Sequence, residues 1–214
     1  LIFYQVNLGY NMSKSVVGAI LTGGKSSRMN YINKSFLNIN NKDFIEIIIN
    51  TLSKRLEKIY INANQDQEKY TKFNRPIVSD LIKGFKGPLA GLHSIMKQFE
   101  YDKSDIWFAL VPTDAPFIPI EYIDNFIKHS NADNLVFISR INNKIEPMFS
   151  FWSIKTLEII EKELIKSNGV KIMKIAEDLN YDFIDFNTVN EIEFMNINTN
   201  DDYLKIKNLS RESD

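Results

Sequence analysis

The residues best suited to chemistry lie in one short segment, LTGGKSSRMNYINK, which runs from Leu21 to Lys34. An apolar run leads into Gly23 and Gly24, and small hydroxyls, Arg28 and Lys34 follow. Glycines let the backbone approach an anion and direct successive N–H groups at it. Arginine adds a planar, bidentate fork and lysine a point charge. The segment predicts a phosphate-binding loop, and the alternative is a glycine-rich surface loop with ordinary basic residues.

Two widespread phosphate-binding patterns do not fit this segment. A Walker A loop requires G-x-x-x-x-G-K-[ST]. Gly24, Lys25 and Ser26 supply its end, but Ala19 stands where the first glycine belongs. A G-x-G-x-x-G pattern is also absent. A nucleotide, if one binds, is held in another way.

Two carboxylates follow predicted strands. Asp114 comes directly after the very apolar run at 106–111 and stands among three prolines, and Asp80 follows the run at 76–78. A carboxylate at such a strand end suits Mg²⁺, which takes one or two carboxylates together with substrate phosphates. The alternative for Asp114 is an Asx turn or a helix cap without metal. Gly87 and Pro88 are typical of a helix start.

The elements that must position these residues alternate along the chain. Apolar or alternating runs predict strands at 16–21, 58–64, 76–78, 106–111, 135–139, 148–152, 183–186 and 194–198. Helical spacing predicts helices at 44–56, after 88, at 120–128, 154–165 and 170–179, and after 199. Strands separated by helices indicate a parallel sheet with right-handed crossovers. We expect a three-layer α/β/α, Rossmann-like domain with a mainly parallel central sheet, which places ligands at the carboxyl ends of its strands.

Composition excludes several kinds of chemistry. The chain of 214 residues has no cysteine and two histidines, so it has no thiol nucleophile, thiolate metal site or three-histidine zinc site of its own. We expect His93 and His129 at helix surfaces or caps, and Trp107 and Trp152 in the core. A net charge of -1 gives no basic field for nucleic acid.

The ends and the location of the chain follow from the same composition. No apolar run approaches the ~18 residues of a membrane span. We therefore expect a cytoplasmic protein with no membrane partner. Residues 1–11 lack a basic leader and a cleavage site, and we interpret them as an upstream or cloning-derived extension. Residues 12–214 are expected to form a single domain.

Four motifs, in this order, resemble the molybdenum cofactor guanylyltransferase family. Residues 21–34 match the family's opening pattern, L-A-G-G-x-S-x-R-M-G followed by D-K. Residues 87–91 match G-P-L-A-G, residues 114–116 match D-x-P, and residues 194–199 match F-x-N-x-N-T. The similarity extends from 15 to about 207. Asn30 and Asn33 stand where the family has glycine and aspartate, and Asn200 where it has proline. The change at 33 removes a carboxylate that could orient Lys34.

The resemblance implies a nucleotide site. Its nucleotide-binding residues would be Leu21, Thr22, Gly23, Gly24, Lys34, Asn62, Asp80 and Asp114. Within this set, Lys34 would contact the phosphates, Asn62 the base side, and Asp114 would hold Mg²⁺. Asn62 could also be a turn residue at a strand end.

The resemblance also implies the reaction. Arg28, Lys34 and Asp114 would be catalytic, and Asn196 and Asn198 would face a pterin substrate. The expected reaction transfers GMP from GTP to the phosphate of molybdopterin, or of its molybdenum-bound form, with release of pyrophosphate.

Two alternatives remain open. The related cytidylyltransferases usually have Ala-Gly at positions 23–24 and D-x-D-T-P at 196–200, so both differences favour guanine. The first alternative is therefore a molybdopterin cytidylyltransferase or a sugar-phosphate nucleotidyltransferase. The second is a non-catalytic, nucleotide-binding accessory protein that contacts molybdoenzymes or their chaperones.

Overall fold

The structure is a computed structural model that describes residues 14–22, 33–84, 86–102, 105–130, 133–167 and 169–210. Three predicted site residues, Gly23, Gly24 and Arg28, lie outside the described residues, as does the expected extension at 1–11.

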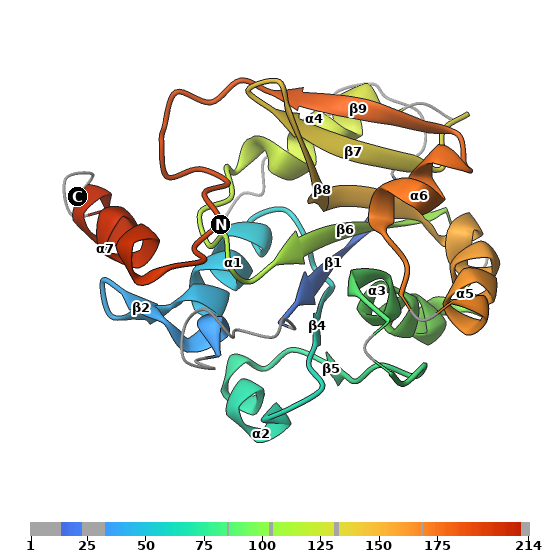
Figure 1. The fold of residues 1–214 in the computed structure, drawn as a ribbon, viewed down its shortest axis with the longest axis horizontal. Helices are drawn as coiled ribbons and strands as arrows, with labels where there is room; N and C mark the ends of the chain where they lie inside the picture. The colour runs from blue at the N-terminus through green and yellow to red at the C-terminus, as the bar shows by residue number, and fades with distance from the viewer. Residues whose placement is uncertain are drawn as a thin grey trace, which may run out of the picture.

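A seven-stranded sheet forms the centre of the molecule (Figure 1). Its strands are β1 (Ser15–Leu21), β4 (Ile59–Asn62), β5 (Ile77–Val78), β6 (Ile106–Pro112), β7 (Val136–Ile141), β8 (Lys144–Ser153) and β9 (Tyr181–Phe186). They lie in the order β5-β4-β1-β6-β8-β7-β9. The pairings β4–β5, β1–β4, β1–β6 and β7–β9 are parallel, and β8 is antiparallel to both of its neighbours. The mainly parallel sheet is thus confirmed, with one antiparallel strand inserted.

Helices cover both faces of the sheet, as expected for three layers. The helices of the described residues are α1 (Phe44–Leu52), α2 (Gln67–Tyr70), α3 (Pro88–Met96), α4 (Glu121–His129), α5 (Leu157–Lys166), α6 (Ile172–Glu177) and α7 (Asn200–Leu209). Short 3₁₀ turns are η2 (Lys34–Phe36), η3 (Thr71–Phe73), η4 (Lys97–Phe99) and η5 (Ile154–Thr156). Apolar side chains of α1 and α4 pack on one face, and those of α3, α5 and α6 on the other.

Period-two alternation explains how one strand serves both faces. In β1, Ile20 belongs to the core under α1 and α4, whereas Ala19 and Leu21 belong to the core under α3 and α5. In β6, Trp107 and Phe108 divide in the same way. Trp107 and Trp152 are both buried, as predicted.

A third apolar cluster lies beside the sheet. The two-stranded hairpin β2 (Asn38–Ile39) and β3 (Lys42–Asp43) brings Ile39 against Phe44, Ile192, Ile197 and Ile206. This cluster attaches α7, which Figure 1 shows at one side of the molecule, to the rest of the domain.

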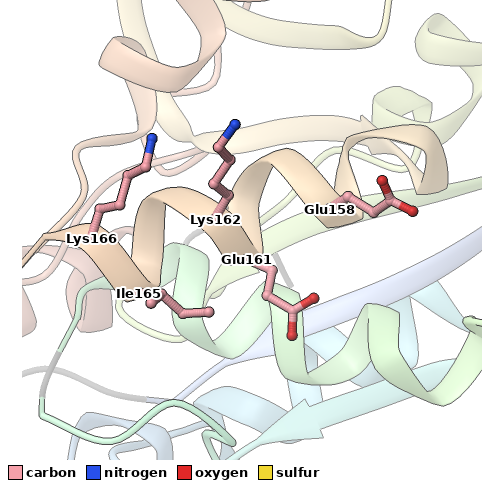
Figure 2. A pocket seen from close by; sticks show the side chains of 5 residues that line it. All are labelled: Glu158, Glu161, Lys162, Ile165 and Lys166. Atoms are coloured by element: carbon pink, nitrogen blue, oxygen red, sulfur yellow. The ribbon is translucent and has the colours of Figure 1, made fainter.

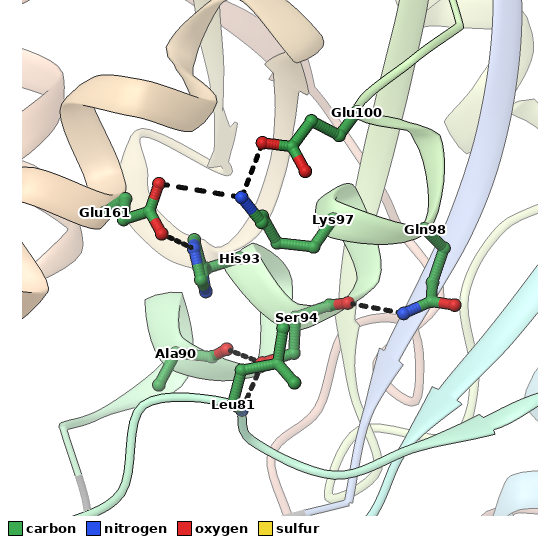
Figure 3. A network of polar contacts seen from close by, with 8 residues as sticks. All are labelled: Leu81, Ala90, His93, Ser94, Lys97, Gln98, Glu100 and Glu161. Atoms are coloured by element: carbon green, nitrogen blue, oxygen red, sulfur yellow. Dashed lines mark hydrogen bonds and ion pairs between the residues drawn. The ribbon is translucent and has the colours of Figure 1, made fainter.

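Two predictions were wrong in this part of the chain and on α3. Residues 194–198 form no strand, because Phe194 takes a left-handed φ of 57° and the segment bonds to the loop after β6 instead. His93 is not at a helix surface: it is 1% exposed, between α3 and α5, with Nε2 3.5 Å from Glu161 Oε1 (Figure 3). His129 is exposed in the last turn of α4.

None of the helices formed by the described residues has the length and apolar character needed to cross a membrane.

Candidate functional site

The carboxyl ends of β5, β4, β1 and β6 meet at one edge of the sheet, because these four strands are parallel neighbours. Leu21 ends β1, and Thr22 follows it. The Thr22 N–H and hydroxyl both donate to the carbonyl of Asn62, at 3.1 and 2.8 Å. On the other side, Thr113 N donates to the Leu21 carbonyl at 3.2 Å. Hydrogen bonds to the backbone therefore continue past the ends of β1 and β6 and hold Thr22 and Thr113 in place.

One group of polar side chains lies at the ends of β4 and β5. Asn62 is 4% exposed, and its Nδ2 donates to Val78 O at 3.1 Å and to Asp80 Oδ1 at 2.9 Å. Asn64 Nδ2 donates to Asp80 Oδ2 at 2.9 Å, and Asp80 N donates to Asn64 Oδ1 at 2.8 Å. The Asp80 carboxylate is thus held by two amides, and Asn62 is a buried positioning group rather than a free turn residue.

Helix α3 begins next to this group. Gly87 takes a φ of 91°, and Pro88 occupies the first helical turn, as predicted for a helix start. Gly91 lies directly against Asn62, since a Cβ added there would be 2.3 Å from Asn62 Oδ1. Glycine at 91 is therefore required by close packing on the site.

A second group gathers around Lys34. Its Nζ donates to Asn198 Oδ1 at 2.7 Å and lies 3.5 Å from Asp114 Oδ2. The lysine side chain is 15% exposed and the aspartate side chain 33% exposed. An ammonium group, a carboxylate and an amide thus converge at the surface where β6 ends, although 164 residues separate Lys34 from Asn198.

Asparagine at 33 does not leave Lys34 without partners. Asn33 caps η2: its Oδ1 accepts from Ser35 N at 3.1 Å, and its Nδ2 donates to Tyr70 Oη at 2.9 Å. Lys34 is instead oriented by Asn198 and Asp114.

The segment before α7 carries Asn198 to this place. Ile197 N donates to the Asp114 carbonyl at 2.7 Å. Thr199 and Asp202 form a capping box, and the Asp202 carboxylate also accepts from Asn198 N at 2.9 Å. The Asn198 N–H, with smaller contributions from other groups, lowers the pKa of Asp202 from its ordinary value. Asn196 is half-buried in the same segment.

Two site residues were missed from the sequence. Asn64 holds Asp80, and Tyr70, 0% exposed, contacts the turn that carries Lys34. The repeated asparagine in the NAN run at 62–64, directly after a strand, is a signal that could have indicated Asn64.

The donor set suits a hard divalent cation bound together with phosphates. Across the described ranges, no three acidic or histidine side chains gather into a complete protein-made metal site. Asp114 offers one partly exposed carboxylate, which is the number that Mg²⁺ often takes from a protein when phosphates supply further oxygens.

A pocket elsewhere on the molecule has no connection with this edge. It has a volume of about 380 Å³ and is lined by side chains of α5 alone (Figure 2): Glu158, Glu161, Lys162, Ile165 and Lys166. Because no residue after a strand end lines it, it is not part of the candidate site.

Known proteins share both the sequence and the fold. The model of the MobA-like NTP transferase domain matches residues 18–179. The probable molybdenum cofactor guanylyltransferase of Clostridium perfringens (strain SM101) is 37% identical over 86% of this chain and 92% of its own. The molybdenum cofactor guanylyltransferase of Vibrio parahaemolyticus is 31% identical over 84% and 89%. The crystal structure of molybdopterin-guanine dinucleotide biosynthesis protein A from Archaeoglobus fulgidus superposes with a TM-score of 0.74 at 20% identity, covering 92% of this chain and 99% of the other. The match to the domain model and these relatives show that the chain belongs to the MobA-like NTP transferase family.

Proposed function

We propose that this protein is a GTP:molybdopterin guanylyltransferase, which transfers GMP from GTP to the terminal phosphate of molybdopterin or its molybdenum-bound form. The relatives that cover most of the chain carry this activity in their names. The observation in the structure that carries the proposal is the convergence of Lys34, Asp114 and Asn198 at the carboxyl edge of the sheet, the edge at which Asn62 and Asp80 also lie.

The reaction is an in-line displacement at phosphorus. A phosphate oxygen of the pterin substrate attacks the α-phosphorus of GTP and forms a new P–O–P bond. The bond from the α-phosphorus to the bridging oxygen breaks, and pyrophosphate leaves with that electron pair. Because the attacking oxygen is already an anion, no general base is required, which agrees with a site whose described residues are lysine, carboxylate and amides.

The residues of this chain would then position and neutralise charge. Lys34 would bind the phosphates, where its ammonium group offsets negative charge that develops on the leaving group. Arg28, seven residues after the last residue of β1 in the sequence, would add a second cation. Asp114 would hold Mg²⁺, which when bound polarises the phosphates and screens their charge. Alignment of the two anionic substrates would supply much of the rate.

The two polar groups suggest how the substrates are arranged. The backbone after Leu21 and Thr22, with Gly23 and Gly24, would follow the nucleotide, and Asn62 and Asp80 would lie on its base side. Asn196 and Asn198 would face the pterin, and Asn198 hydrogen-bonds to Lys34. Lys34 would thus lie between the two substrates, where the bond is made.

A nucleotide panel tests the choice of base. We expect GTP with Mg²⁺ to raise the melting temperature, whereas CTP and UTP leave it nearly unchanged. At a ligand concentration one hundred times the dissociation constant, stabilisation is ~2.7 kcal/mol, which is on the order of 5–10 °C for a domain of this size.

Two variants make the panel specific. Lys34→Ala should lose most of the shift with GTP, whereas Lys128→Ala, which removes an exposed lysine of α4, should keep it. A clear shift with CTP and none with GTP would favour a cytidylyltransferase instead. Binding of GTP without pyrophosphate release in the presence of molybdopterin would favour the accessory protein.

A further inference from the structure

A buried chain of hydroxyl groups lies behind the turn that carries Lys34. Tyr70 Oη, at the end of α2, donates to Ser35 Oγ at 3.1 Å, and Ser35 Oγ donates to Thr113 Oγ1 at 3.3 Å. Asn33 Nδ2 donates to the same tyrosine hydroxyl at 2.9 Å. Tyr70 and Ser35 are 0% exposed and Thr113 is 5% exposed, so protein groups rather than bulk water satisfy these hydroxyls.

The direction of this chain is fixed at its first member. The Asn33 amide could in principle be turned either way, but its oxygen must face the backbone N–H of Ser35, which can only donate. Its NH₂ group therefore faces Tyr70 and donates to the hydroxyl. Tyr70 must then give its own proton to Ser35, and Ser35 gives its proton to Thr113.

The chain of hydroxyl groups links the neighbours of Lys34 in sequence to the residue before Asp114. Lys34 lies between Asn33 and Ser35 in sequence, and both neighbours hydrogen-bond to Tyr70. At the other end, Thr113 directly precedes Asp114, and its N–H is held by the end of β1. The Tyr70 hydroxyl is therefore linked directly to both neighbours of Lys34, and through Ser35 Oγ to the residue before Asp114.

We propose that Tyr70 is a positioning residue, whose hydroxyl holds the turn at 33–35 against Thr113 and thereby sets Lys34 beside Asp114. This inference rests on the proposed function, in which Lys34 binds the substrate phosphates. Tyr70 touches no reacting atom, and it acts through Lys34. This role also gives Asn33 a function in the turn, because its amide group donates the first hydrogen bond of the hydroxyl chain, to Tyr70.

A double-variant cycle tests this role with pyrophosphate release from GTP, Mg²⁺ and molybdopterin. Tyr70→Phe keeps the ring, which packs against Phe36 with centroids 4.8 Å apart, and removes only the hydroxyl. We expect the rate to fall roughly tenfold, as for one hydrogen bond in a coupled network, with a smaller change in KM for GTP. In a Lys34→Ala background, Tyr70→Phe should cost less than about threefold more, because the group that it positions is already gone.

Two further variants control the cycle. Ser35→Ala breaks the chain at a second point and should show the same dependence on Lys34, which keeps the test valid if one variant folds poorly. Tyr60→Phe removes a hydroxyl on the other face of the sheet, where the ring packs against Phe99, and should leave the rate unchanged.

The outcomes separate this inference from the proposed function. Equal activity of Tyr70→Phe and the original protein, or a full tenfold loss in the Lys34→Ala background as well, would overturn the positioning role. If the original protein releases no pyrophosphate, the proposed function fails, and the same cycle is then read from dissociation constants for GTP. Loss of the Tyr70→Phe effect in the Lys34→Ala background supports the inference in either measurement.

Discussion

Replacement of Gly91 by alanine tests the packing of α3 on the candidate site. The added Cβ would lie 2.3 Å from Asn62 Oδ1, 2.7 Å from its Cγ and 2.9 Å from Leu21 Cδ2. To reach the 3.4 Å of ordinary contact, the amide oxygen must move by about 1.1 Å. Asn62 is 4% exposed and holds hydrogen bonds to Val78 and Asp80, so it cannot move without loss of those bonds.

The cost follows from these contacts. Overpacking in a filled core costs about 1–3 kcal/mol, and each lost hydrogen bond about 0.5–1.5 kcal/mol. With both Asn62 hydrogen bonds lost, the total is about 2–6 kcal/mol. We therefore expect Gly91→Ala to lower the melting temperature by roughly 4–24 °C, at about 2–4 °C per kcal/mol for a domain of this size. Because the displaced amide also holds Asp80, affinity for GTP should fall by about tenfold or more. Thermal unfolding and calorimetric titration with GTP and Mg²⁺ measure the two effects.

Two further variants separate this clash from a general effect of alanine. Gly169→Ala is the matched control, because a Cβ there meets nothing within 4 Å, and it should change neither quantity. Asn62→Ala removes the two closest atoms that the added Cβ meets, and leaves only the contact with Leu21 Cδ2 at 2.9 Å. Added to Gly91→Ala, it should therefore recover stability relative to the single variant without recovering GTP affinity. If Gly91→Ala were as stable as the original protein and bound GTP equally well, the close packing described here would be refuted.

Two other predictions follow from the charged groups. Asp114→Ala should lower turnover by about a hundredfold or more, which is the usual effect of losing one group that stabilises transition-state charge. Its thermal unfolding should change little, because the Asp114 side chain is 33% exposed. Near-normal turnover with ordinary Mg²⁺ dependence would contradict this prediction. Burial lowers the pKa of His93 below 6.5 despite the nearby Glu161 carboxylate, with Lys97 also facing it (Figure 3). Near pH 6.5 the His93 imidazole therefore binds a proton in the unfolded chain but stays neutral in the folded protein. The free energy of unfolding should decline as the pH falls below about 6.5, because the unfolded state binds more protons. His93→Gln should reduce this decline in denaturant titrations and His129→Gln should not; identical pH profiles for the two variants would contradict the prediction.

The parallel half of the sheet could be predicted from the sequence because its strands are short apolar runs that end in glycine, aspartate or proline. The run at 16–21 became β1 and the run at 106–111 became β6, with ends displaced by one residue. Strand direction was harder, since periodicity identifies a strand but not its partner. The residues MFSFW contain no signal that β8 runs antiparallel to both of its neighbours, β6 and β7.

One overlooked signal would have identified both hairpins. Ile-Asn-Asn-Lys occurs twice, at 39–42 and at 141–144. At each place the two asparagines take left-handed φ angles, 50° and 62° in the first and 48° and 67° in the second. Asparagine tolerates this conformation, which a two-residue turn between antiparallel strands requires. The repeated motif therefore predicts β2–β3 and β7–β8.

The site was predictable where one residue follows one strand, and not where distant segments meet. Asp80 and Asp114 could be placed at the sheet edge from their positions after apolar runs. The contact between Lys34 and Asn198 depends on how α7 and the segment before it pack on the hairpin, and local patterns do not encode that packing. Tyr70 was missed for the same reason: a tyrosine in a short polar helix gives no local sign that its hydroxyl serves a turn 35 residues earlier.

Pyrophosphate release from purified protein with molybdopterin, Mg²⁺ and one nucleoside triphosphate at a time tests the central claim most directly. The proposed function predicts release with GTP, dependence on molybdopterin, and formation of a guanine dinucleotide of the pterin in equal amount. Release with CTP in place of GTP, or GTP binding without any release, would contradict it.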